Sequence, residues 1–227
     1  RSRFDDALRE IDVGRAAALS IGDRFGEMFG LESAAFALMI ARRWREARMP
    51  AEAACSLAAE IGARRYESIM AIVVAMALKG EGDQAGAEER SAHALRLAEE
   101  TGLGFAGALI EAMRANILED VEAARAAIER GEGLLRQTSM AHNHIFFYEF
   151  AIDWAIETDD WPRVETYAGR LAQFTAAYPL PNADLIVGRA RALARLHRDP
   201  TDRAAKRDLA DLASLARATD FRLGFPA

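Results

Sequence analysis

The residues of this chain that could carry out acid–base chemistry occur mainly as neighbouring carboxylates. Five such pairs are present: Asp5-Asp6, Glu88-Glu89, Glu99-Glu100, Glu119-Asp120 and Asp159-Asp160. Two carboxyl groups held close together can serve as a general acid and a general base. Adjacent residues on a helix, however, point about 100° apart, because a helical turn holds 3.6 residues. We therefore interpret these pairs as solvated side chains and helix caps, and we expect no catalytic residue among them.

Metal and nucleotide chemistry is also unsupported by the motifs. His142 and His144 lie two residues apart, so on a helix their rings diverge, and no third ligand accompanies them. Neither H-E-x-x-H nor C-x-x-C occurs, and the phosphate loop G-x-x-x-x-G-K-[ST] is absent. The segment 80–83 (GEGD) is better interpreted as a turn in which Asp83 caps the next helix. We expect no metal, no cofactor and no enzymatic activity.

The composition excludes further classes of function. The 227 residues carry a net charge of −6, which argues against nucleic acid or an anionic membrane as the main partner. The longest apolar run, 69–78, is too short to cross a bilayer. The single cysteine, Cys55, cannot form an intrachain disulfide and lies among small apolar residues, as expected of a buried thiol in the cytoplasm. A basic segment, 189–207, is interpreted as a solvated face, with a docking surface as the alternative.

A repeat indicates the fold. Gly22, Gly62 and Gly102 each close an alanine-rich segment and are spaced 40 residues apart. Glycine is favoured just beyond a helix end, where the backbone turns left-handed. Further expected helix ends at Thr138, Ala177 and Thr219 continue this repeat with less regular spacing. A period of about 37–42 residues is that of two helices and two turns. The sequence predicts an all-α, right-handed α-solenoid of TPR-like helical hairpins, as a single domain over residues 1–227.

Individual helices follow from hydrophobic periodicity and caps. Residues 65–79 are apolar nearly all round, so this helix must be covered on both sides. Residues 83–100 carry a stripe of mostly small residues that lets helices approach closely (Ala87, Ser91, Ala94, Leu95, Ala98). Four residues are expected to cap helices: Asp83, Asp120, Asp160 and Thr201. The segment 179–181 (PLP) separates two hairpins.

An aromatic segment, 140–150 (MAHNHIFFYEF), is the strongest candidate for a binding site. We expect a helix over 143–158, capped by Asn143 and apolar on three sides. Such a helix either is buried as core or lines a groove. In the second case the candidate ligand or partner surface comprises His144, Phe146, Phe150 and Trp154, since aromatic side chains dominate interface energies.

Residues 141–194 also resemble a known family. The segments 141–144 (AHNH), 160–161 (DW), 174–181 (FTAAYPLP) and 188–194 (GRARALA) are similar to the C-terminal tetratricopeptide-like region of bacterial signalling proteins that join a class III adenylate or guanylate cyclase to a P-loop ATPase. The segment 96–109 also resembles the sequences of this family. Asn182 stands where the family often has an aromatic residue, and Glu149 near a usually basic position. The resemblance implies that any catalytic domains lie N-terminal to this chain, which itself begins at Arg1 as an expected fragment.

These observations favour a non-catalytic, cytoplasmic helical-repeat domain that regulates by binding. Its expected partner is a protein or peptide, including domains of the same polypeptide, held on the concave face of the stack. The alternative is a sensor for a small molecule or peptide with an aromatic-lined pocket. A stand-alone helical enzyme is the third hypothesis, and no convergent set of acid, base or metal ligands favours it.

Overall fold

The computed structural model describes residues 3–137, 140–221 and 223, and every element in these residues is helical. The eleven helices are α1 (Arg3–Ser20), α2 (Arg24–Ile40), α3 (Trp44–Glu60), α4 (Arg64–Glu81), α5 (Gln84–Thr101), α6 (Gly107–Ile117), α7 (Val121–Gln137), α8 (Ala141–Glu157), α9 (Trp161–Thr175), α10 (Pro181–Arg198) and α11 (Arg203–Ala218). The expected all-α class is confirmed for the described residues, and α3, α5, α7, α9 and α11 begin at residues 44, 84, 121, 161 and 203.

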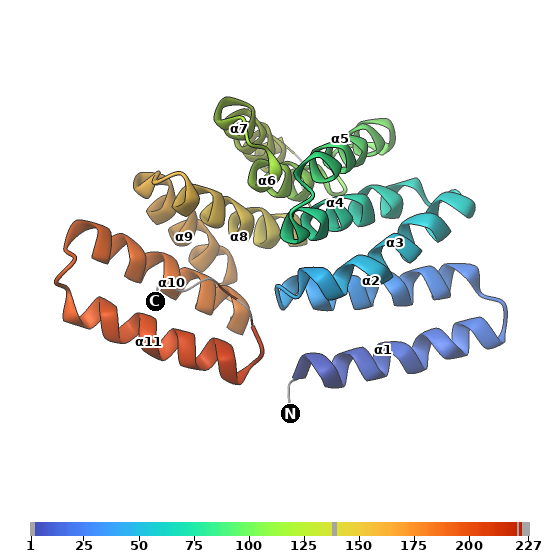
Figure 1. Cartoon of the computed structure of the whole chain (residues 1–227), viewed down its shortest axis with the longest axis horizontal. Helices are drawn as coiled ribbons and strands as arrows, with labels where there is room; N and C mark the ends of the chain where they lie inside the picture. Colours follow the sequence, from blue (N-terminus) through green and yellow to red (C-terminus); the bar gives the residue numbers. More distant parts are fainter. Residues whose placement is uncertain (1–2, 138–139, 222, 224–227) are drawn as a thin grey trace.

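Consecutive helices pack as hairpins, and the hairpins follow one another along an arc (Figure 1). Each even-numbered helix from α2 to α8 also contacts the next even-numbered helix, so the five helices α2, α4, α6, α8 and α10 form one layer. The odd-numbered helices pack against this layer, each on its neighbours in the chain. This arrangement explains why α4 is apolar nearly all round, because its odd- and even-numbered neighbours cover it and its residues 67–77 are all buried.

The turns confirm the helix ends predicted at Gly22, Gly62 and Gly102, 40 residues apart, and Gly82 ends a further helix between two of them. Gly22, Gly62, Gly82 and Gly102 all have positive φ, from 72° to 100°. Arg42 lies midway between Gly22 and Gly62 and adopts the same left-handed conformation with φ 59°, although a side chain at such a position is strained. The expected helix end at Ala177 lies just beyond α9, and Thr219 is the C-cap of α11. The expected end at Thr138 lies outside the described residues.

Three of the four predicted helix caps are confirmed, and all three are aspartates. Asp83 accepts a hydrogen bond from the backbone of Gly86, Asp120 accepts from Glu122 and Ala123, and Asp160 accepts from Arg163. The prediction for Thr201 was wrong by one residue. Asp202 caps α11 instead, because its carboxylate accepts from both Ala204 and Ala205, whereas Thr201 is itself a donor to Asp199.

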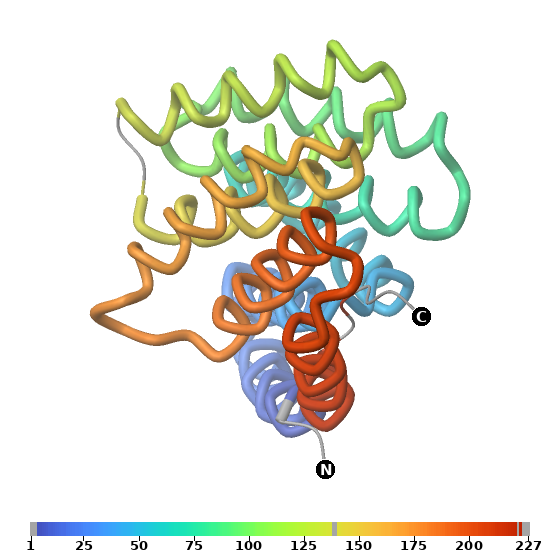
Figure 2. Tube along the Cα trace, turned by 90° about the vertical axis from the view of Figure 1, so that its left-hand side faces the viewer, coloured from blue at the N-terminus to red at the C-terminus, as the bar shows by residue number. Residues whose placement is uncertain are grey.

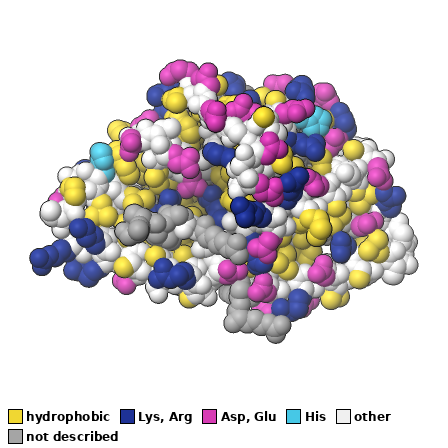
Figure 3. Space-filling model, viewed as in Figure 1, with side chains coloured by type: hydrophobic (Ala, Val, Ile, Leu, Met, Phe, Trp, Pro, Cys, Tyr) yellow, Lys and Arg dark blue, Asp and Glu magenta, His cyan; other side chains and the backbone are white. Residues whose placement is uncertain are grey.

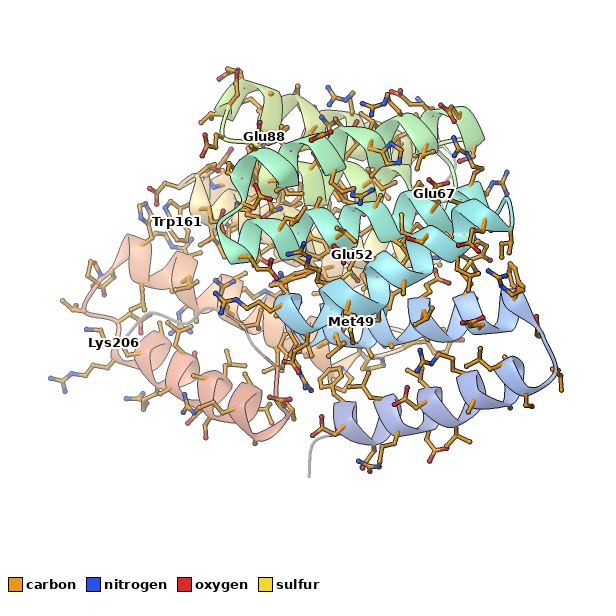
Figure 4. The ribbon with its side chains drawn as sticks, turned by 45° about the vertical axis from the view of Figure 1, so that its right-hand side comes forward. Met49, Glu52, Glu67, Glu88, Trp161 and Lys206 are labelled. Atoms are coloured by element: carbon orange, nitrogen blue, oxygen red, sulfur yellow. The ribbon has the colours of Figure 1, made fainter. Side chains whose placement is uncertain are left out.

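Close approach between helices depends on small residues. Ala87, Ser91, Ala94 and Ala98 of α5 are buried as predicted; the fifth buried position is Leu97, and Leu95 is only partly buried. Figure 4 shows Glu67 near the start of α4, between α3 and α5, where its carboxylate lies 3.7 Å from Nε2 of His93. The helices are therefore joined by apolar contacts with a few buried polar groups among them.

Ion pairs about one repeat apart tie successive hairpins together. Arg24 pairs with Glu60 at 2.5 Å, and Arg64 pairs with Glu100 at 3.0 Å, one repeat later. In the C-terminal part Arg198 pairs with Glu165 at 2.6 Å. Acidic and basic side chains accordingly intermingle over the face shown in Figure 3. Several arginines of the basic segment 189–207 are engaged in such pairs within the chain.

Candidate functional site

The aromatic segment forms α8, an inner helix, and most of its rings are core. Phe150 and Trp154 are each only 2% exposed, Phe147 is fully buried, and Phe146 is half-buried. The helix begins at Ala141, two residues earlier than predicted, so Asn143 is not its cap. The side chain of Asn143 instead donates to the carbonyl of Phe105 at 3.0 Å, across to the α5–α6 connection.

A segment from the other end of the chain covers the third apolar face of α8. The ring of Phe36 in α2 lies 5.8 Å from that of Phe146, and Trp44 at the start of α3 lies 6.1 Å from Phe150. The guanidinium of Arg42 lies 4.9 Å from the centre of the Phe150 ring. Contact across the arc therefore buries a face that two hairpin neighbours alone would leave open.

Charged groups accompany this contact. Nη1 of Arg42 lies 2.6 Å from Oδ2 of Asp153 in α8, and Nη1 of Arg189 in α10 lies 3.1 Å from Oδ1 of the same carboxylate. The three side chains are 10–15% exposed. One aspartate thus joins the α2–α3 turn to α10. We call Arg42, Asp153 and Arg189 the central ion cluster.

A second buried carboxyl group lies one turn earlier on α8. Glu149 is 4% exposed, and its Oε1 accepts a hydrogen bond from Nδ2 of Asn182 at 2.9 Å. Burial raises the pKa of Glu149 to about 7, although Arg42 and the Asn182 hydrogen bond act in the opposite direction. Glu149 of α8 and Asn182 of α10 are therefore direct partners.

Arg43, the residue that follows Arg42, links the two ends of the chain. Its Nη1 lies 3.0 Å from a carboxylate oxygen of Asp5 in α1 and 3.3 Å from one of Asp220, just after α11. Figure 2 shows α1 and α11 approaching each other at the same edge of the molecule. The ion pairs of Arg42 and Arg43 therefore connect the α2–α3 turn with α8 and with the residue that closely follows α11.

Exposed and half-buried rings of the inner helices and of the α5–α6 connection form a continuous band, which we call the aromatic row. Neighbouring ring centroids along it are 5.6–6.4 Å apart, a range typical of aromatic pairs. Phe25 and Phe29 at one end are 48% and 49% exposed, and the others are half-buried. The row consists of Phe25, Phe29, Tyr66, Phe105, His142 and Phe146.

The four predicted site residues are thus not brought together as one surface. Phe146 belongs to the aromatic row, whereas Phe150 and Trp154 lie in the core. His144 faces another way and stacks on Phe174 of α9, with ring centroids 4.8 Å apart. Sequence reasoning missed Phe25 and Phe29, although their i, i+4 spacing in an alanine-rich helix is a readable signal.

A cavity apart from the aromatic row is also present in the described residues. It has a volume of about 640 Å³ and opens between α1, α2 and α3, where Leu8, Leu38 and Met49 contribute to its lining. Met49 is 79% exposed and stands at the surface of α3 (Figure 4). This cavity does not touch α8 or the central ion cluster.

Neither a metal-binding cluster nor an accessible thiol occurs among the described residues. They contain no group of three or more His, Cys, Asp or Glu side chains placed to hold a metal ion. Cys55 is buried, and this burial raises the pKa of its thiol, which keeps it protonated and unreactive. Along the same residues, none of the helices combines the length and apolar character needed to span a membrane.

Comparison with known proteins adds no family. No family model, no curated protein and no solved structure matches this chain.

Proposed function

We propose that this chain is a non-catalytic helical-repeat domain that binds a protein or peptide segment through the aromatic row. The observation that supports this most directly is the exposure of Phe25 and Phe29, about half of each ring, at the open end of a continuous band. Aromatic rings held rigidly by their neighbours lose little conformational entropy on binding and anchor interfaces well.

The finer proposal follows the sequence resemblance. The hairpins are a right-handed, TPR-like solenoid in a bacterial cyclase-like signalling protein of the cytoplasm, and the bound segment belongs to another protein or to a different domain of the same polypeptide. Binding would regulate by stabilising one state of the attached domains over another. The periodic helix starts and the layer of inner helices are consistent with this proposal.

The small-molecule sensor is the weaker alternative. A pocket lined by Phe150 and Trp154 would require the core of α8 to open, because both rings are already covered. The aromatic row needs no such opening at Phe25 and Phe29, which favours an extended partner over an enclosed ligand.

Selection of a displayed peptide library on the intact chain tests the proposal. We expect enriched peptides whose affinity falls at least tenfold in the double variant Phe25→Ser/Phe29→Ser. The matched control is Met49→Ser, which removes a 79%-exposed apolar side chain outside the row and should leave affinity unchanged. Failure to enrich any peptide, or equal losses in the row variant and the control, would contradict the proposal.

A further inference from the structure

Glu32 lies on the same face of α2 as the exposed end of the aromatic row. Phe25, Phe29, Glu32 and Phe36 are spaced i, i+4, i+7 and i+11, so their side chains share one helix face. Glu32 therefore lies between Phe29, one turn before it, and Phe36, one turn after it. An acidic residue interrupts an otherwise aromatic stripe.

One oxygen of this carboxyl group is buried without a hydrogen-bond partner. Glu32 is 6% exposed, and its Oε2 atom is shielded from solvent with no hydrogen-bond partner. Burial alone raises the pKa of Glu32 to about 7, since no neighbouring charge compensates for the lost hydration. An unsatisfied buried carboxyl group is costly to a fold, so it requires an explanation.

The other inner helices show how the chain treats similar residues. Glu67 of α4 pairs with Arg64 at 3.1 Å, and Glu111 of α6 pairs with Arg130 at 2.8 Å. Glu149 of α8 accepts from Asn182 at 2.9 Å. Each of these buried glutamates has a donor within the chain. Glu32 is the corresponding buried glutamate of α2, but its Oε2 atom has no hydrogen-bond donor.

A series of ring contacts begins and ends on α2, on either side of Glu32. Starting from Phe29, ring contacts run through Tyr66, Phe105, His142 and Phe146 and return to α2 at Phe36. The last step, Phe146 to Phe36, has a centroid distance of 5.8 Å. Helix α2 closes this circuit of rings, because it carries both Phe29 and Phe36. Glu32 lies on the same face of α2, between these two residues.

We propose that Glu32 and these rings bind an alkylammonium group, the lysine side chain of a bound peptide. The faces of aromatic rings attract cations, and a carboxylate supplies the ion-pair partner that an ammonium group needs when it leaves water. Phe29, half exposed, stands one turn from Glu32, so rotation of its ring would admit the side chain. This inference rests on the proposed function, because it specifies what the aromatic row recognises.

Binding of n-butylammonium chloride, which reproduces the end of a lysine side chain, tests the site directly. Titration followed by NMR should show saturable shifts of backbone amides in α2 that n-butanol at equal concentration does not cause. In Glu32→Gln the affinity should fall at least tenfold. The Gln side chain is close in size and uncharged, so this variant should fold at least as well as the parent. Absence of saturable shifts, or unchanged affinity in Glu32→Gln, overturns the inference.

A second comparison separates this inference from the proposed function. Peptides enriched on the intact chain should contain a lysine whose replacement by norleucine weakens binding at least tenfold, and Glu32→Gln should abolish that difference. If peptides bind through Phe25 and Phe29 but are insensitive to both changes, the proposed function stands and the ammonium site is wrong. If n-butylammonium binds but no peptide does, the cation site serves a free amine, and both the lysine assignment and the proposed function fail.

Discussion

Arg42 forms an ion pair with Asp153 although the two residues are on opposite arms of the arc. Nη1 of Arg42 lies 2.6 Å from Oδ2 of Asp153, and both side chains are largely buried. Arg42 reaches this position with a left-handed backbone, φ 59°, at a turn where glycine stands in neighbouring repeats. The strained backbone at Arg42 therefore occurs at the residue that joins the α2–α3 turn to α8.

Replacing Arg42 should separate the strain from the ion pair. Arg42→Ala removes the pair and keeps a Cβ in the left-handed turn, so we expect a loss of about 3–5 kcal/mol in the free energy of unfolding. Arg42→Gly removes the pair as well but relieves the turn, and should be about 1 kcal/mol more stable than Arg42→Ala. Urea denaturation measures both. Equal stability of the two variants would show that the turn is not strained.

Truncation of the α8 rings should follow their burial. Phe147→Ala and Phe150→Ala each remove a buried ring and should cost about 3–5 kcal/mol. Phe146→Ala should cost clearly less, since its ring is half-buried and belongs to the aromatic row. Thermal or urea melts provide the measurement. Equal losses in all three variants would place Phe146 in the core and weaken its role in binding.

Two glycines of α7, Gly131 and Gly133, allow a matched pair of substitutions to alanine. A Cβ on Gly131 would lie 2.5 Å from Cε2 of the fully buried Phe147 ring, so Gly131→Ala should destabilise the chain by about 1–3 kcal/mol. A Cβ on Gly133 meets nothing within 4 Å, so Gly133→Ala should stabilise the helix by about 0.5–1 kcal/mol. Opposite signs in denaturant unfolding are the expected result, and a stabilising Gly131→Ala would contradict the packing of α7 on α8.

The buried carboxyl of Glu149 should make stability depend on pH. Its pKa rises from 4.5 to about 7 on folding, so between these values the folded state binds more protons than the unfolded state. The contribution of this group is therefore most favourable below about pH 4.5 and is lost as the pH rises through about 7. Glu149→Gln keeps an acceptor for Asn182 but cannot titrate.

Unfolding of the two proteins at pH 5 and pH 8 measures this effect. Stability of the parent relative to Glu149→Gln should fall between the two pH values, by up to about 1.4 kcal/mol for each unit of pKa shift. Other titrating groups are common to both proteins and cancel in the difference. A difference that does not change with pH would show that Glu149 does not titrate in this range.

The chain should also lack nucleotide chemistry. Because the sequence contains no phosphate loop, we expect neither ATP binding nor turnover by the purified chain. Calorimetry and a phosphate-release assay measure the two properties. Turnover that a point substitution within these residues abolishes would contradict the expectation.

The sequence by itself determined the local structure of this protein. Gly22, Gly62 and Gly102 marked helix ends, because a left-handed turn favours a residue without Cβ. Asp83 and Asp160 marked helix starts, because their carboxylates bind the first free amides. The apolar residues of α4 indicated a helix covered on both sides. All of these signals act within one or two turns of a helix, so they can be read from neighbouring residues.

Only the tertiary structure decided which side chains meet across the arc. The α2–α3 turn contacts α8 although the two segments are far apart in the sequence, and no local pattern encodes such a contact. This contact buried Phe150, which the sequence left open between core and groove, and it paired Arg42 with Asp153 over a separation of more than a hundred residues. It likewise placed Phe36 against Phe146, which closed the circuit of rings that begins and ends on α2.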